Sequence, residues 1–363
     1  MSRSSVLVLG LGLCGHGLAA ADATGDPPLT ITDFWHGRAH FELISKSAFP
    51  EYGMRAMNVG FHFVTRPGGV WYLFHREYNF APRPEYCVAD WARIVVRKST
   101  NQGRNWTDAH VIATPSGPFP NSGNNTAEPQ APDECALTDG AGYFDEQAET
   151  WHYLSQCNNR TRHWMLCHYS KKGADPMDGG LWVKNKANPV VVPGQLWSKI
   201  CAGGIAAGKA CDGEHDGGHG THDEGTPEIV KTDAQGYHYV TFHGCNDGAT
   251  RSARGVARTR DFVQWETNGD GLPGDAIFGQ VDCNQWNVSG GWANGTCIGG
   301  GEGSIVTAAD GYMYMLIEAP DISLGCLRDG QNWVLGLLRS KTFSTFPALH
   351  LCIFGTQNSE NPI

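Results

Sequence analysis

The sequence has almost no helical periodicity. After its first residues it also has no apolar run near the roughly 20 residues of a membrane-spanning helix. Basic residues are sparse, with 27 Lys and Arg against 37 Asp and Glu. Because phosphate recognition depends on clustered Lys and Arg, this balance argues against a nucleic-acid partner. The sequence therefore predicts an all-β protein with no membrane association beyond its N-terminus.

Residues 1–23 have the pattern of a secretory signal peptide. A short charged start precedes the stretch VLVLGLGLCGHGLAAADA, and small residues near Ala21 to Ala23 offer a cleavage site. A membrane anchor is the alternative interpretation. No linker divides the rest, so we expect residues 24–363 to form one secreted, extracellular and monomeric domain.

Eleven of the twelve cysteines follow the signal, which favours an oxidising compartment and predicts disulfides. The closely spaced pairs that could form bridges are Cys157 with Cys167, Cys201 with Cys211, and Cys283 with Cys297. Glycosylation sequons agree with export, and they lie at Asn105, Asn124, Asn159, Asn287 and Asn294.

Four segments repeat an apolar strand, a Gly-containing turn and a second aromatic strand: 59–76, 140–157, 226–244 and 303–320. Each continues into a third strand and a turn that ends near Trp or Phe. Four-stranded units in a fixed order indicate propeller blades, whereas a β-sandwich would not repeat this ending. We expect a five-bladed β-propeller, with a six-bladed one as the alternative. The C-terminal sequence predicts an incomplete last blade, which strands near residues 31–44 would complete.

Two of these units resemble known carbohydrate-active propellers. STNQGRNW at 99–106 resembles the Asp box of sialidases, with Asn101 in the place of its Asp. VARTRDFVQW at 256–265 resembles the third blade of arabinanase-like and fructosidase-like five-bladed glycosidases. The resemblance covers about residues 55–345 and implies carbohydrate chemistry, with an acidic residue just before an innermost strand.

Glycoside cleavage needs one carboxyl as acid and a second as base or nucleophile. On this resemblance the candidates before the innermost strands are Asp139, Glu224, Glu228 and Glu302. The third blade of arabinanase-like enzymes carries the motif Glu-Gly-Pro. Here Thr226 stands between the Gly and the Pro, which leaves the choice between Glu224 and Glu228 open. The first unit offers Arg55 and Asn58 where a catalytic Asp is expected, which weakens a hydrolytic mechanism of the arabinanase type.

Substrate-binding candidates come from the start of the first unit, from the residues before Glu224, and from HREY at 75–78, which resembles the second strand of sialidase blades. They are Arg55, Asn58, Arg76, His222 and Asp223. A sialidase-like enzyme would need clustered arginines to bind a sugar carboxylate, and Arg251 and Arg254 add to that set. Trp151, Trp164, Trp286 and Trp292 could stack on sugar rings.

The segment CDGEHDGGHGTHDEG at 211–225 is rich in imidazole and carboxylate groups. His215, His219 and His222 could bind a structural zinc or calcium ion, although the alternative is a flexible polar loop. We expect that activity requires no cofactor. Two functions remain open at this point: a glycoside hydrolase acting on an oligo- or polysaccharide, and a carbohydrate-binding propeller without catalysis.

Overall fold

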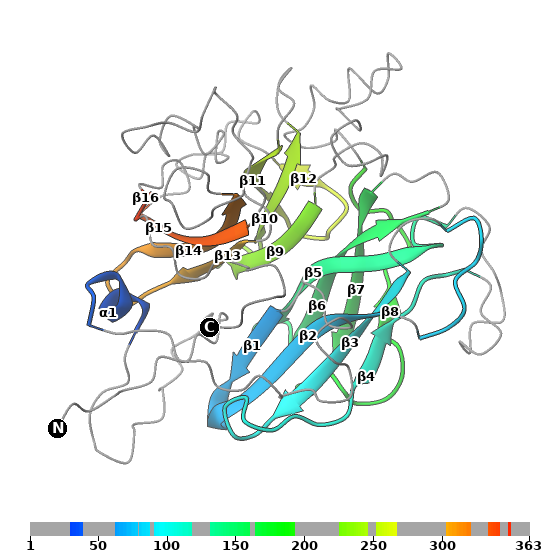
Figure 1. The fold of residues 1–363 in the computed structure, drawn as a ribbon, viewed down its shortest axis with the longest axis horizontal. Helices are drawn as coiled ribbons and strands as arrows, with labels where there is room; N and C mark the ends of the chain where they lie inside the picture. The colour runs from blue at the N-terminus through cyan, green and yellow to red at the C-terminus, as the bar shows by residue number, and fades with distance from the viewer. Residues whose placement is uncertain are drawn as a thin grey trace, which may run out of the picture.

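The computed structural model describes eleven ranges of the chain: residues 30–38, 62–78, 80–87, 91–117, 131–159, 164–192, 225–245, 252–266, 303–320, 333–341 and 348–349. These residues are mostly β-structure, and they form four antiparallel sheets of four strands each (Figure 1). Among them, no helix is both long and apolar enough to cross a membrane.

Each sheet consists of four strands that are consecutive in the chain. Sheet one comprises β1 (His62–Arg66), β2 (Val70–Tyr78), β3 (Ala92–Ser99) and β4 (His110–Ala113). Sheet two comprises β5 (Ala136–Asp145), β6 (Thr150–Asn158), β7 (Trp164–Lys172) and β8 (Val183–Lys184). Sheet three comprises β9 (Gly225–Thr232), β10 (His238–Cys245), β11 (Ser252–Thr259) and β12 (Trp265–Glu266). Sheet four comprises β13 (Gly303–Thr307), β14 (Met313–Pro320), β15 (Trp333–Ser340) and β16 (Ala348–Leu349). A short 3₁₀ turn, η2 (Pro67–Gly69), connects β1 and β2.

The first strands of neighbouring sheets contact one another. β1 contacts β5, β5 contacts β9, and β9 contacts β13, so that neighbouring sheets follow the chain order. The four first strands therefore lie toward one another and the fourth strands lie farther out, so we call the first strand of each sheet its innermost strand (Figure 1). The four hairpin units predicted from the sequence are confirmed, including their third and fourth strands.

Apolar side chains fill the spaces between adjacent sheets. Between sheets one and two, Phe74 packs with Trp151 and Tyr153 in a cluster whose largest members are fully buried. Between sheets two and three, a second cluster joins Leu154 to Phe242 and other apolar residues. Aromatic and β-branched residues fit these pleated, two-sided surfaces, which explains why so many strand residues are apolar on both faces.

The turn between β3 and β4 carries the Asp-box-like sequence. The hydroxyl of Ser99 accepts a hydrogen bond from the Gly103 amide at 2.9 Å, and Asn101 Oδ1 accepts one from the Asn105 amide at 2.9 Å. Gly103 has φ +81°, and a Cβ there would come within 3.2 Å of the Trp71 ring. The turn thus has a local structural role, since its polar side chains satisfy its own backbone.

The N-terminal residues correct one expectation. Residues Ile31–Trp35 form α1, a short helix, and not a strand of a closing blade. Thr30 caps the helix, and a capping box with Asp33 completes its first turn. The helix packs on sheet four, where Trp35 makes an edge-to-face contact with Tyr314. The five-blade count stays a prediction, and residues 39–44 lie outside the described ranges.

Candidate functional site

Asp139 is the fourth residue of β5, the innermost strand of sheet two. The pairing of β5 with β6 shifts register between Leu137 and Gly140, so that Asp139 lies in a β-bulge. Gly140 is required next to it, because a Cβ there would come within 2.0 Å of the Leu154 carbonyl oxygen. Bulges of this kind redirect a side chain away from the regular alternation of the strand. The local backbone therefore fixes where the Asp139 carboxylate points.

The partner of Asp139 comes from the neighbouring sheet. Nη1 of Arg76, on β2, lies 2.8 Å from Oδ1 of Asp139. The side chains are 10% and 18% exposed, so the ion pair is largely shielded from solvent. A charge-assisted contact of this length is stronger than a neutral hydrogen bond. The sequence predicted both residues as site candidates from different motifs, and the structure brings them together.

Glu228 occupies the equivalent place in sheet three, as the fourth residue of β9. Here too the register shifts, between Thr241 and His243 of β10. Thr226, two residues before Glu228, has φ +40°, which is an unfavourable conformation for a β-branched residue. Strained backbone of this kind persists where the surrounding structure enforces it, often next to a functional group.

Glu228 joins three innermost strands. Its Oε1 lies 3.2 Å from Nε2 of His62 on β1 and accepts a 2.7 Å hydrogen bond from the Ser304 hydroxyl on β13. Its Oε2 accepts a 3.0 Å hydrogen bond from the Ile305 amide. Glu228 is only 5% exposed, so these contacts replace water around the carboxylate. Both oxygens act as acceptors, and the carboxylate connects sheets one, three and four.

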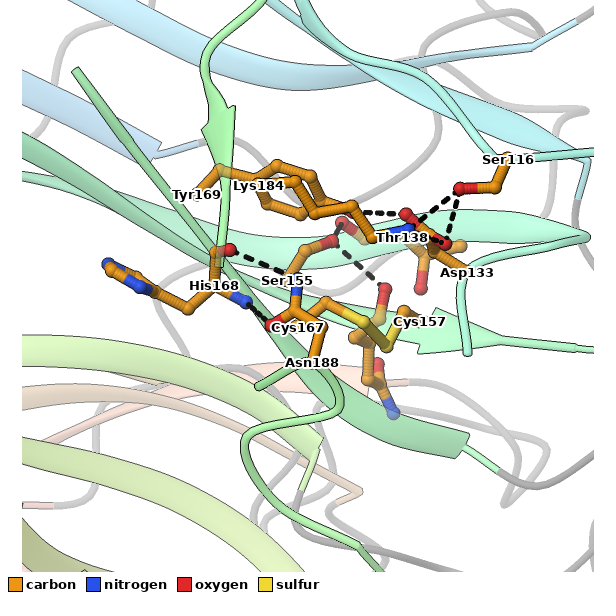
Figure 2. The surroundings of a disulfide bond; sticks show 11 residues. Ser116, Asp133, Thr138, Ser155, Cys157, Cys167, His168, Tyr169, Lys184 and Asn188 are labelled. Carbon is orange, nitrogen blue, oxygen red and sulfur yellow. Dashed lines mark hydrogen bonds and ion pairs between the residues drawn. A yellow bond between two sulfur atoms is a disulfide. The ribbon is translucent and has the colours of Figure 1, made fainter. Parts of the chain in front are cut away.

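Two disulfides stabilise the end of sheet two that holds Asp139. Cys135, directly before β5, bonds to Cys87. Cys157 bonds to Cys167 across β6 and β7 (Figure 2), which confirms that predicted pairing. The other two predicted pairs, Cys201 with Cys211 and Cys283 with Cys297, lie outside the described residues.

A fully buried carboxylate stabilises the same approach to β5. Asp133 accepts hydrogen bonds at 2.7 Å from both the Lys184 ammonium and the Ser116 hydroxyl (Figure 2). The Tyr169 hydroxyl donates to its second oxygen at 2.6 Å. These three partners come from separate parts of the chain. Their hydrogen bonds satisfy the Asp133 carboxylate, which can therefore remain buried at 0% exposure.

The other predicted site residues fall in parts of the chain for which the structure gives no description. They are Arg55, Asn58, His215, His219, His222, Asp223, Glu224, Arg251 and Glu302, with Trp286 and Trp292. Trp151 corrects an expectation, because it is 0% exposed and packs inside the core instead of offering a face to a sugar. Nothing in the structure bears on the side chain of Trp164.

Sequence reasoning missed two contributors. His62 begins β1, and Ser304 is the second residue of β13; each belongs to the start of an innermost strand. Neither residue is a carboxylate, so neither was predicted from the acids that precede the innermost strands. Their position in the sequence was the available signal. Asp139 was predicted because it lies at the start of a first strand, and His62 and Ser304 lie at the starts of other first strands.

The sequence matches no protein-family model and no curated protein. Solved structures resemble its fold. BT0996, in an RGII complex, has a TM-score of 0.50 at 10% identity, and the match covers 82% of this protein and 77% of that one. The endo-arabinase from Bacteroides thetaiotaomicron VPI-5482 has a TM-score of 0.49 at 12% identity, covering 83% and 82%. Zg3597, a family 117 glycoside hydrolase from the marine bacterium Zobellia galactanivorans, has a TM-score of 0.48 at 11% identity. That match covers 82% of this protein and 71% of Zg3597. At these identities the likeness is one of fold.

Proposed function

We propose that this protein is a secreted glycoside hydrolase with a five-bladed β-propeller fold, acting on an oligo- or polysaccharide. One observation carries the proposal: Asp139 and Glu228 are both the fourth residue of an innermost strand, and each follows or lies in a β-bulge. This repeated placement of acids on the first strands suits a reaction that needs two carboxyl groups, with Asp139 as one of them and an acid of another unit as the second. The two disulfides are compatible with export.

Sheet one takes a different part in this arrangement. It supplies Arg76 to Asp139 and His62 to Glu228, so each acid has a basic partner from the first unit. The first unit would then orient the acids of its neighbours instead of providing a carboxylate of its own. This proposal explains why the first unit has no Asp at the expected position: its basic residues contact acids of sheets two and three.

In the proposed reaction, sheets two and three have different roles. Asp139 would act on the reacting sugar as base or nucleophile, because its 18% exposure leaves part of its side chain accessible. Both oxygens of Glu228 are already occupied by protein donors, so Glu228 holds the strands in place. Glu224, directly before β9, is then the third-unit candidate for the proton donor, and Glu302 remains a fourth-unit candidate.

The decisive experiment measures turnover by the full secreted protein on a panel of aryl glycosides and plant and algal polysaccharides. Asp139→Asn should lower kcat about 100-fold or more, because the carboxylate is lost while the shape is kept. Asp178→Asn, at an exposed turn outside the innermost strands, is the matched control and should retain full activity. Full activity in Asp139→Asn would overturn the assignment.

Comparison of Glu224→Gln with Glu228→Gln separates the two third-unit acids. A proton donor should lose turnover and keep its thermal stability, whereas a strand-connecting carboxylate should lose both. The engagement of Glu228 by protein groups also favours a second candidate, a carbohydrate-binding propeller without catalysis. That function is supported if the protein retains a polysaccharide in affinity electrophoresis but releases no product from any member of the panel.

A further inference from the structure

Three buried side chains from two sheets meet at a second place, between sheets two and three. Asp145 ends β5, His152 lies on β6 and His238 begins β10. Their exposed fractions are 6%, 9% and 5%, and one potential ligand atom of each lies within 4.8 Å of the others. Asp145 is the sixth residue after Asp139 along β5, which corresponds to about 20 Å of extended strand. The cluster is therefore distinct from the candidate glycosidase site.

Backbone and side-chain hydrogen bonds orient two members of the cluster. Oδ1 of Asp145 accepts hydrogen bonds from the amides of Gln147 at 2.8 Å and Ala148 at 3.0 Å. Nδ1 of His238 lies 2.8 Å from the hydroxyl of Thr232. The remaining atoms, Oδ2 of Asp145 and Nε2 of His238, are 4.0 Å apart. Each residue thus presents one polar atom to the other.

His152 completes the cluster with an unsatisfied atom. Its Nδ1 lies 3.0 Å from Nε2 of His168. Its Nε2 is buried and has no hydrogen-bond partner among the residues that the structure describes. A buried polar nitrogen without a partner destabilises the folded state, so such an atom in a well-packed interface calls for a ligand.

We propose that Asp145, His152 and His238 bind a divalent transition-metal ion of the zinc class. Two imidazole nitrogens and one carboxylate oxygen are ligands that zinc accepts, with a water at the fourth position. Calcium is disfavoured because it takes oxygen ligands. Zinc bonds of about 2.0 to 2.2 Å put tetrahedral ligand atoms roughly 3.4 Å apart. Binding therefore brings the ligand atoms closer to one another by up to about 1.4 Å and joins sheet two to sheet three.

The hydrogen bonds behind the ligands determine how tightly the ion binds. Oδ1 of Asn185 accepts a 2.9 Å hydrogen bond from the Ala187 amide, so its amide nitrogen faces Nδ1 of His168 at 3.1 Å and donates to it. His168 then donates from Nε2 to Nδ1 of His152. In this series of donors a neutral His152 carries its proton on Nε2, the atom that must bind the metal.

Metal binding reverses this series of hydrogen bonds. His152 must donate from Nδ1 to His168, and the proton of His168 then lies on Nδ1, opposite the Asn185 amide nitrogen. Only an oxygen at that place can accept it. Asn185 therefore weakens the site, and Asn185→Asp should strengthen it, because a carboxylate can accept from both Ala187 and His168. Partners behind metal ligands typically change affinity 10- to 100-fold.

Calorimetric titration of the chelator-treated full-length protein with zinc chloride, together with elemental analysis after dialysis, tests the proposal. Asn185→Asp should bind one zinc ion about 10-fold or more tightly than the natural protein. His238→Ala in the Asn185→Asp background should lose that ion, with circular dichroism confirming that the variant is folded. The double variant His215→Ala and His219→Ala is the matched control, since it removes histidines from the other candidate metal segment and should keep the ion.

These experiments measure bound metal and not turnover, so their outcomes are independent of the glycosidase assay. Equal zinc affinity in the natural protein and Asn185→Asp would overturn the proposal. It would also be overturned if neither of the two bound zinc, since the cluster would then hold a water molecule, or if the loop control lost the ion. Unfolding of His238→Ala leaves the Asn185→Asp comparison as the deciding measurement.

Discussion

The guanidinium of Arg76 on β2 lies 2.8 Å from the carboxylate of Asp139 on β5, across the boundary between sheets one and two. This contact gives the acid of one sheet a basic partner from another. Because neither residue is adjacent to the other in sequence or in a hairpin, the pair exists only when the two sheets pack. The geometry of the candidate site therefore depends on the packing of the sheets as well as on the strands themselves.

The Arg76 and Asp139 pair should show strong energetic coupling. Arg76→Met should lower the free energy of unfolding by about 3 kcal/mol, because it removes the guanidinium that pairs with a largely buried carboxylate. The double variant with Asp139→Asn should recover part of this loss. Urea denaturation of the two single variants and the double variant measures the coupling. Additivity within about 0.5 kcal/mol would show that the ion pair is energetically unimportant.

Loss of the Ser304 hydroxyl should weaken the junction at Glu228. Ser304→Ala removes a 2.7 Å hydrogen bond to a buried carboxylate and should cost about 2 kcal/mol of unfolding free energy. Thr307→Ala is the matched control on the same strand, where the side chain is exposed and the change should stay within about 0.5 kcal/mol. Equal stability of the two variants would contradict the junction role. Thermal denaturation followed by circular dichroism provides the comparison.

The sequence predicted the hairpins because their signal is local. Alternating apolar residues on either side of a Gly-containing turn determine which strands pair within one unit. The bridge between Cys157 and Cys167 is equally local, with a separation of 10 residues, and it was predicted. The bridge between Cys87 and Cys135 spans 48 residues and two sheets, so no spacing rule selected it.

Contacts between sheets could not be predicted in this way. His62 and Glu228 are 166 residues apart, and their contact depends on how three innermost strands converge. Helix α1 is a different kind of miss, because its signal was present. Thr30 and Asp33 have the spacing of a capping box, although the prediction for residues 31–44 was β-structure.

The two disulfides should differ in their effect on stability. Loop-closure entropy predicts about 4 kcal/mol from the 48-residue bridge and about 2.7 kcal/mol from the 10-residue bridge. Replacing both Cys87 and Cys135 by Ala should therefore destabilise the protein more than the same change at Cys157 and Cys167. Denaturant unfolding of the two paired variants gives the order. The reverse order would indicate that local packing, and not chain entropy, dominates.

Stability should depend on pH through Asp175. Partial burial raises its pKa, but hydrogen bonds from Lys98 Nζ at 2.7 Å and the Met177 amide at 2.9 Å outweigh burial, and the net pKa lies below 3.8. A carboxyl with a lower pKa in the folded state stabilises the protein above about pH 3.8, and this contribution disappears as the pH falls through the folded value. The Tm difference between the natural protein and Asp175→Asn should therefore shrink on acidification. A Tm difference that did not change with pH would contradict this role of Asp175.

Gly140 offers the most direct test of how the backbone positions Asp139. A methyl group at residue 140 would come within 2.0 Å of the Leu154 carbonyl oxygen and 2.9 Å of the Ser155 Cα, both of them backbone atoms that cannot rotate away. Gly140→Ala should therefore force β5 and β6 apart at the bulge and cost at least about 2 kcal/mol of unfolding free energy. Because Asp139 precedes this residue, glycoside turnover should fall further than the loss of folded protein explains. Gly180→Ala is the matched control: its Cβ meets no atom within 4 Å, so stability and turnover should be unchanged. If Gly140→Ala behaved like this control, the close approach of the two strands would not be what fixes the Asp139 carboxylate.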